Sequence, residues 1–192
     1  MSSISGDRSD FRELKEVIKE FLSYMDFAYN FRLQKQVFYG ELWCLNNYGK
    51  RLTDADFKPY FHGSFSEDIE TALEEMRADG EVEYVNVEKQ DGWTFEYKRH
   101  ETGGRLSPGK KEIIKEIYGE VRGLKSKQLA QLSKQNWLFR DTEMGESMDF
   151  DRYLDEGTPP TPQLERLSAR IDVDKPVGDI NDSSDLESLL TE

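Results

Sequence analysis

The sequence is poor in the residues that build disulfides and metal sites, with one Cys and two His among 192 residues. A single thiol, Cys44, cannot form a disulfide within the chain. A structural zinc site needs about four Cys or His ligands, and Cys44, His62 and His100 lie far apart in the sequence. We therefore predict no metal site. Because Cys44 lies in an apolar segment, we expect it to be a buried and unreactive thiol.

Long apolar runs and an excess of positive charge are lacking as well. No stretch approaches the about 20 apolar residues of a membrane-spanning helix, and residues 1–10, MSSISGDRSD, lack the apolar core of a signal peptide. We therefore expect a cytoplasmic protein that does not contact a membrane. The net charge is −13, and phosphate backbones bind basic surfaces. The charge thus disfavours nucleic acid as the main partner.

The usual signatures of catalysis are missing too. Gly103-Gly104 lacks the lysine and the spacing of a phosphate-binding loop. Paired carboxylates such as Glu74-Glu75 fall in amphipathic helical segments, where acidic residues normally form the solvated face. We assign no catalytic residue and no cofactor, and we predict that the protein is not an enzyme.

The clearest local pattern that is present runs from residue 57 to residue 99. An extended aromatic run at 57–61 contains Pro59 and breaks at Gly63, where a turn is expected to need positive φ. Ser64 and Glu67 match a capping box, which predicts a helix over 64–79 that ends at Gly80. One face of this helix is apolar, with Phe65, Ile69, Ala72, Leu73 and Met76.

A β-hairpin is predicted next, with strands at about 81–87 and 93–98. In the second strand Trp93, Phe95 and Tyr97 alternate with polar residues and are expected to face the helices. Asp91-Gly92 is predicted to form the tight turn. Strand, helix and hairpin make up much of a winged-helix module, although no second short helix precedes residue 64.

Other segments predict further helices. Residues 10–25 form an amphipathic helix capped by Asp10. Residues 31–47 are apolar nearly all round, which indicates a central buried helix, and Gly40 within it predicts close packing against another backbone. Ser107-Pro108 begins a helix that Gly119 is expected to end. Shorter helices are predicted over 125–133 and 149–154.

The composition changes at residue 156, where several prolines are followed by mostly acidic residues. Such a segment cannot bury enough apolar surface to fold. We therefore predict a flexible N-terminus at 1–9, one domain at 10–155 and a disordered acidic tail at 156–192. The fold class is α+β, mainly α-helical, with a small antiparallel β-hairpin that is winged-helix-like.

Several short motifs carry a resemblance to a known family. The motifs Leu33-Gln34-Lys35-Gln36-Val37-Phe38-Tyr39, Leu42-Trp43 and Tyr48-Gly49-Lys50-Arg51-Leu52 resemble the SocA-like Panacea domain. Ser126–Leu132 and Trp137 are similar to that family's C-terminal helix and tryptophan, and the resemblance covers about residues 10–155. Phe61-His62-Gly63-Ser64-Phe65 stands where the family usually has a Gly-Pro-Val-like turn, here without the proline. Residues 61–76 are also similar to the YwgA-like family.

The Panacea family occurs in proteins linked to toxin–antitoxin systems and phage-associated genes. The resemblance therefore implies a non-enzymatic, antitoxin-like module that binds or sequesters a protein partner, such as a cognate toxin. The candidate partner-binding residues are Gln34, Lys35, Tyr39, Phe61, His62, Gly63 and Ser64.

The alternative function is that of a winged-helix DNA-binding regulator. Its candidate nucleic-acid contacts are Lys89, Lys98, Arg99, Arg105, Lys110 and Lys111. The outer face of the 64–79 helix is acidic and would repel phosphates. The identity of the partner and the oligomeric state are left open.

Overall fold

The computed structural model describes residues 11–89, 92–99 and 105–155. The elements follow one another as α1 (Arg12–Ser23), α2 (Asn30–Tyr48), β1 (Lys58–Tyr60), β2 (Gly63–Phe65), α3 (Glu67–Ala78), β3 (Val82–Lys89), β4 (Gly92–Arg99), α4 (Pro108–Val121), α5 (Ser126–Gln135), α6 (Trp137–Asp141) and α7 (Phe150–Asp155). The strands pair as two separate antiparallel hairpins, β1–β2 and β3–β4. The predicted α+β class with a helical majority is confirmed. Asp10 and the predicted segments 1–9 and 156–192 lie outside the described residues.

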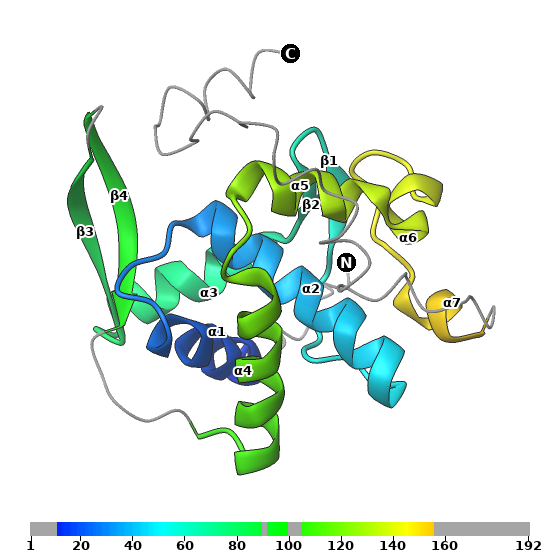
Figure 1. Ribbon diagram of the computed structural model, residues 1–192, viewed down its shortest axis with the longest axis horizontal. Coiled ribbons are helices and arrows are strands. Elements are labelled where there is room, and N and C mark those ends of the chain that lie inside the picture. The colour runs from blue at the N-terminus through cyan, green and yellow to red at the C-terminus, as the bar shows by residue number, and fades with distance from the viewer. Residues whose placement is uncertain (1–10, 90–91, 100–104, 156–192) are drawn as a thin grey trace, which may run out of the picture.

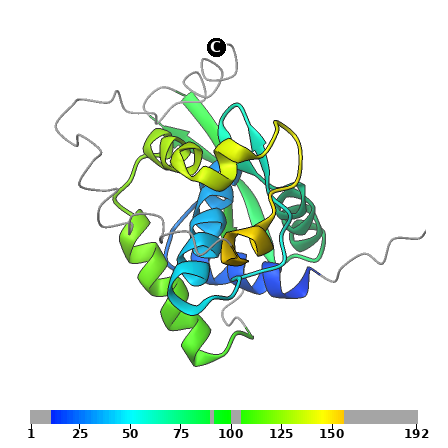
Figure 2. The same cartoon turned by 90° about the vertical axis from the view of Figure 1, so that its right-hand side faces the viewer.

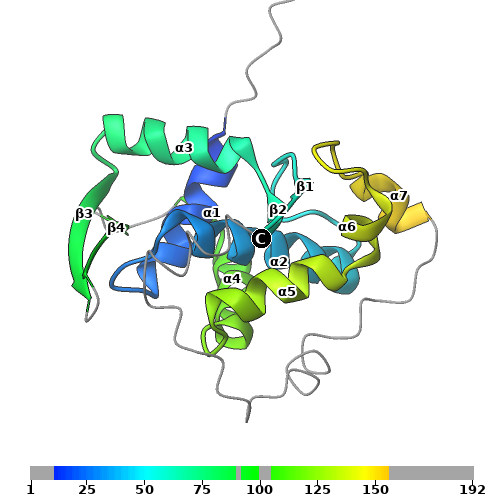
Figure 3. The same cartoon turned by 90° about the horizontal axis from the view of Figure 1, so that it is seen from above.

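Helix α2 is the central element of the fold. It contacts α1, α4, α5 and β2, and Figure 2 shows it, in blue and cyan, with α4, α5 and α1 arranged around it. Figure 3 shows it between the β3–β4 hairpin at one end and α7 at the other. The predicted buried helix is confirmed, and it ends at Gly49, whose φ of 63° is the left-handed conformation of a helix C-cap.

Gly40 is the point of closest approach on α2. A Cβ at this position would overlap the side chain of Leu52, and Ile117 of α4 would lie 3.7 Å away. The prediction of close packing is therefore right, but the neighbour is a side chain and not another backbone. Leu52 is 1% exposed, so it has little room to move aside.

The capping box predicted at Ser64 is wrong. Ser64 belongs to β2, where it pairs with Pro59 of β1, and α3 begins three residues later at Glu67. The residue before the helix, Ser66, is held in an extended conformation by two hydrogen bonds to the side chain of Gln34. This tertiary contact prevents the helix from starting earlier. The predicted apolar stripe is confirmed at Ile69, Ala72, Leu73 and Met76, which are all buried.

The β3–β4 hairpin follows α3, as predicted, and is joined to the helices by one bridge. Ala28, between α1 and α2, exchanges two backbone hydrogen bonds with Tyr97 of β4, at 2.7 and 3.0 Å. Gly92 belongs to β4 and pairs with Lys89 of β3. Asp91 lies outside the described residues, so the predicted Asp91-Gly92 turn stays a prediction. Tyr97 packs against the core as expected. The side chains of Trp93 and Phe95 lie outside the description, so their predicted inward orientation stays a prediction.

Helix α4 begins as predicted, because the Ser107 hydroxyl accepts a hydrogen bond from the Lys110 backbone N–H and Pro108 takes the first helical position. The predicted end at Gly119 is wrong. The helix continues to Val121, which is fully buried like Ile117 one turn earlier. Apolar burial on both sides of Gly119 therefore outweighs its low helix propensity.

The last elements close the core over β1. The backbone N–H groups of Gly145 and Met148 donate to the carbonyl oxygens of Pro59 and Phe57, at 3.0 and 2.8 Å. Phe150 then packs edge-on against Phe57, with the ring centroids 6.2 Å apart. In α5 the leucines 129 and 132 are buried, as predicted. No helix in the described ranges is both long enough and apolar enough to cross a membrane.

Two helical glycines allow a direct test of the packing around α2. We expect Gly119→Ala to raise the free energy of unfolding by about 0.5–1 kcal/mol, because alanine is the better helix former and nothing lies within 4 Å of the new Cβ. Gly40→Ala should lose all of this gain and fall to or below the wild-type value, because its Cβ overlaps Leu52. Urea unfolding of both variants measures the difference. Equal stabilisation by the two alanines would contradict the close approach.

Candidate functional site

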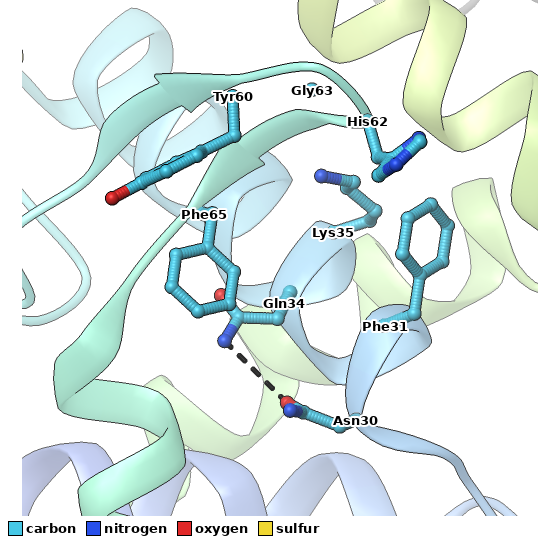
Figure 4. A pocket seen from close by; sticks show the side chains of 8 residues that line it. All are labelled: Asn30, Phe31, Gln34, Lys35, Tyr60, His62, Gly63 and Phe65. Carbon is cyan, nitrogen blue, oxygen red and sulfur yellow. Dashed lines mark hydrogen bonds between the residues drawn. The ribbon is translucent and has the colours of Figure 1, made fainter. Parts of the chain in front are cut away.

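A pocket of about 320 Å³ lies between the start of α2 and the β1–β2 hairpin. Figure 4 shows its walls: one side comes from α2 and the other from the two strands and the turn between them. The lining residues are Asn30, Phe31, Gln34, Lys35, Tyr60, His62, Gly63 and Phe65. The pocket is thus built by two segments that are about 30 residues apart in the sequence.

Gln34 fixes the position of the outgoing end of the hairpin. Its amide Nε2 donates to the Ser66 carbonyl oxygen at 2.8 Å, and its Oε1 accepts from the Ser66 N–H at 2.9 Å. The side chain therefore bonds both backbone groups of one residue, as a neighbouring strand would. Asn30 is 3.4 Å from the same Nε2 and donates in turn to Glu70 of α3 at 2.9 Å.

Lys35 forms the floor of the pocket. The residue is 2% exposed, and its ammonium donates to the Ser64 carbonyl oxygen at 2.5 Å and lies 4.9 Å from the centroid of the Phe31 ring. Burial, with a smaller contribution from the nearby charge of Lys134, lowers the pKa of Lys35 to about 7. This ammonium therefore holds its proton much less strongly than an ordinary lysine does.

Gly63 allows the hairpin to turn directly over α5. Its φ is 97°, as the sequence predicted, and a Cβ there would overlap Ser133 and lie 3.1 Å from the carbonyl oxygen of Ala130. The Ser133 hydroxyl accepts from the Ser64 N–H at 3.3 Å and donates to Ala130 at 2.8 Å. The turn is therefore held by hydrogen bonds from both α5 and α2.

The rim of the pocket is aromatic and exposed at the hairpin tip. Phe61 is 72% exposed, and the rings of Tyr60 and Phe65 pack edge-on with centroids 5.2 Å apart. Burial, followed by the charges of Lys134 and Lys35, lowers the pKa of His62 below its usual 6.5. Neighbouring positive charge, that of Lys134 in both cases, therefore contributes to both shifts.

The structure brings six of the seven predicted partner-binding residues together. Gln34, Lys35, His62 and Gly63 line the pocket, while Phe61 and Ser64 flank them in the hairpin. Tyr39 is elsewhere: it is 2% exposed, and its hydroxyl donates to the Leu129 carbonyl oxygen at 3.4 Å. Its ring packs against α5 inside the protein, so Tyr39 offers no surface to a partner in this conformation.

Four of the lining residues were missed by the sequence reasoning. Asn30 and Phe31 lie four residues before Gln34 and Lys35, and so on the same face of α2, which is a signal that the helical period contains. Tyr60 and Phe65 flank the Gly63 turn on both sides. Their convergence requires the hairpin, which the predicted helix over 64–79 excluded.

The candidate nucleic-acid contacts do not converge on one surface. Lys89 and Arg99 stand at opposite ends of the β3–β4 hairpin, because Lys89 pairs with Gly92 and Arg99 with Val82. Lys98 lies over the Phe27 ring, and Arg105 and Lys111 lie beyond the hairpin, near or in α4. Lys110 forms an ion pair with Glu13.

The acidic face of α3 disfavours nucleic-acid binding, and the described His and Cys residues do not gather as metal ligands. Exposed acidic residues cover the outer face of α3, namely Glu67, Glu70 and Glu74, and they would repel a phosphate backbone. Among the described residues, no group of three or more His, Cys, Asp or Glu could hold a metal ion. Cys44 is buried as predicted, and burial raises the pKa of its thiol to about 12.

A comparison with protein families identifies the domain. A family model described as antitoxin SocA-like, Panacea domain, matches residues 33–138. The chain belongs to this family. The matched region runs from α2 to α6 and contains every lining residue of the pocket except Asn30 and Phe31. The Panacea resemblance is therefore confirmed, while the similarity to the YwgA-like family stays a prediction. Neither the curated proteins nor the solved structures give a significant match.

Gly63 and Gly145 form a matched pair for testing the turn of the Panacea domain. Both have positive φ, at 97° and 85°, but nothing lies within 4 Å of a Cβ added at Gly145. Gly145→Ala should therefore lower the free energy of unfolding by about 1–2 kcal/mol through backbone strain alone. Gly63→Ala should cost at least about 1 kcal/mol more, because of the overlap with α5. Thermal or urea unfolding measures both, and equal losses would contradict the contact.

The buried ammonium of Lys35 predicts a pH-dependent stability. Between pH 7 and about 10.5 the unfolded chain keeps a proton on this lysine that the folded chain releases. Unfolding then takes up protons, so stability rises with pH, by up to about 1.4 kcal/mol per pH unit. Lys35→Met should remove this rise and leave other contributions unchanged. Urea unfolding at pH 7.5, 8.5 and 9.5 measures the slope, and parallel slopes in the two proteins would show that the ammonium is not buried.

Proposed function

We propose that this Panacea domain is an antitoxin-type module that binds a protein partner and sequesters it, without catalysis of its own. The partner-binding face is formed by the β1–β2 hairpin and the first turns of α2. One observation carries the proposal: an exposed aromatic residue, Phe61, stands at the tip of a hairpin whose backbone is anchored on both sides. Family membership supports the antitoxin role.

Large aromatic side chains provide much of the binding energy at protein interfaces, above all beside pockets from which water can be excluded. Phe61 is 72% exposed and stands next to a pocket with three further aromatic rings, those of Phe31, Tyr60 and Phe65. Such a surface gains free energy when another protein covers it.

The anchoring of the hairpin adds to the affinity. The side chain of Lys35 and that of Ser133 bond the backbone of Ser64 from α2 and α5, and Gln34 bonds Ser66. The loop that carries Phe61 is therefore already ordered before binding, and little conformational entropy is lost when a partner docks. Binding residues on a loop held by a rigid scaffold are typical of interaction domains.

The test uses the product of the gene adjacent to the one that encodes this chain, as the candidate toxin. Co-expression of the two should relieve any growth arrest that the adjacent product causes alone, and the purified proteins should form a stable complex. Phe61→Ala should weaken the complex at least tenfold, which corresponds to about 1.4 kcal/mol, because the largest exposed ring of the face is lost.

Tyr48→Ala is the matched control. Tyr48 is 55% exposed at the far end of α2, outside the residues that line the pocket, and its loss should change the dissociation constant less than twofold. Isothermal titration calorimetry measures both variants. Equal effects of the two substitutions would place the interface elsewhere, and failure of the two proteins to interact in either assay would remove the antitoxin proposal.

A further inference from the structure

The ammonium of Lys35 is a buried charge without a counter-ion. Within the described part of the chain it takes part in no ion pair with a carboxylate. Its contacts are the carbonyl oxygen of Ser64 and the ring of Phe31. The charges that act on it and on the neighbouring His62 are basic, and include that of Lys134. Burying a charge without an opposite partner is costly, and an apolar side chain of the same size would usually be more stable here.

A costly charge that lines a cavity is an indication of a ligand of opposite charge. An ammonium has three N–H donors, and Ser64 accepts one of them. Two remain to meet a ligand. Lys35 lines a pocket of about 320 Å³, and Figure 4 shows its side chain among the other lining residues. We therefore expect an anion that enters the pocket to approach the ammonium.

The remaining walls are mainly apolar. Figure 4 shows the rings of Tyr60 and Phe65 on one side of Lys35 and that of Phe31 on the other, and all three line the pocket. A ligand that fits it combines a negative charge with an apolar group. A volume of about 320 Å³ is at the lower end of the range for ligand sites. It leaves room for about one amino-acid residue rather than for a folded element.

We propose that the pocket binds the C-terminal carboxylate of a partner polypeptide whose last residue is apolar, with Lys35 as the counter-ion. A C-terminal residue carries its carboxylate and its side chain on the same Cα, so both enter a pocket of this size together. An internal acidic residue would need a second residue to fill the aromatic walls. The inference rests on the proposed function in one respect, because it names the part of the protein partner that the hairpin face holds.

The proton equilibrium of Lys35 makes the binding dependent on pH. A carboxylate beside the ammonium stabilises its charged form, so the ligand binds with uptake of a proton when the free site is partly deprotonated. The pKa of free Lys35 is about 7, so affinity should fall as the pH rises from 6.5 to 9. His62 lines the same pocket, and burial, followed by the charges of Lys134 and Lys35, lowers its pKa. This shift favours the neutral imidazole.

The experiment uses the full chain and two small probes, N-acetyl-L-phenylalanine and N-acetyl-L-phenylalaninamide, which differ in the charge of the terminal group. Titrations followed by ¹⁵N–¹H correlation spectra should shift the backbone amides of Gly63 and Ser64. At pH 6.5 the acid should bind at least tenfold more tightly than the amide. The affinity of the acid should fall at least fivefold by pH 9, while that of the amide should not change.

Lys35→Met keeps the length of the side chain and removes the charge, so it should abolish the preference for the acid. Lys58→Met is the control. Lys58 lies in β1, its ammonium forms an ion pair with Glu67, and it does not line the pocket. It should keep the preference. If Lys35→Met does not fold, the pH dependence of the wild-type chain still decides the matter.

Three results would overturn the inference. The first is equal binding of N-acetyl-L-phenylalanine and its amide; the second is that the acid shifts neither the Gly63 nor the Ser64 backbone N–H signal. The third is displacement of the acid by inorganic phosphate at the same concentration. The last would mean a site for free anions without an apolar requirement. Failure here leaves the complex with the adjacent-gene product untouched. Conversely, probe binding as expected without such a complex would remove the proposed function and keep the carboxylate site.

Discussion

The structure depends on polar side chains that helix α2 buries and directs at the backbone of another segment. Gln34 bonds Ser66, and Lys35 bonds Ser64. One to two turns further on, the carboxylate of Glu41 accepts from the backbone N–H groups of Leu52 and Thr53, at 2.8 and 3.0 Å. The segment from residue 51 to residue 66 has little regular structure of its own, so these bonds satisfy backbone groups that would otherwise be buried without partners.

Burying the two charged side chains, Lys35 and Glu41, has different consequences at their two positions on α2. Glu41 has Arg51 beside it, at 3.3 Å, and accepts several N–H bonds, although burial still raises the pKa of its carboxyl above the usual value. It therefore acts as a structural anchor that is satisfied within the chain. The ammonium of Lys35 contacts only one carbonyl oxygen, that of Ser64, and the ring of Phe31 among the described residues. This difference in hydrogen bonding between Lys35 and Glu41 supports our proposal that the functional site lies at the hairpin end of α2.

The same anchoring explains why the β1–β2 hairpin exists. Its strands are three residues each, and an isolated hairpin of that size is not stable in water. It persists because α2 bonds it from one side and α5 supports Gly63 from the other. The exposed aromatic tip and the pocket beneath it are therefore products of long-range packing.

The sequence by itself determined the helical frame, including α2 as the buried centre, the stripe of Ile69, Leu73 and Met76 on α3, and the start of α4 at Ser107-Pro108. These features follow from apolar periodicity and capping chemistry, which act over one or two helical turns. It also indicated the positive φ of Gly63 and half of the residues that line the pocket, through the turn and the family resemblance.

Tertiary structure alone decided where two of the helices begin or end and which way the Tyr39 side chain faces. Ser64 and Glu67 match a capping box, yet Gln34 holds Ser66 extended and α3 starts later. Gly119 lies where a helix could end, yet the burial of Ile117 and Val121 continues α4. Tyr39 sits one turn after Lys35 but faces α5 and not the pocket. In the first two cases tertiary packing outweighs a local preference worth about 1 kcal/mol. In all three, no local pattern in the sequence records the contact.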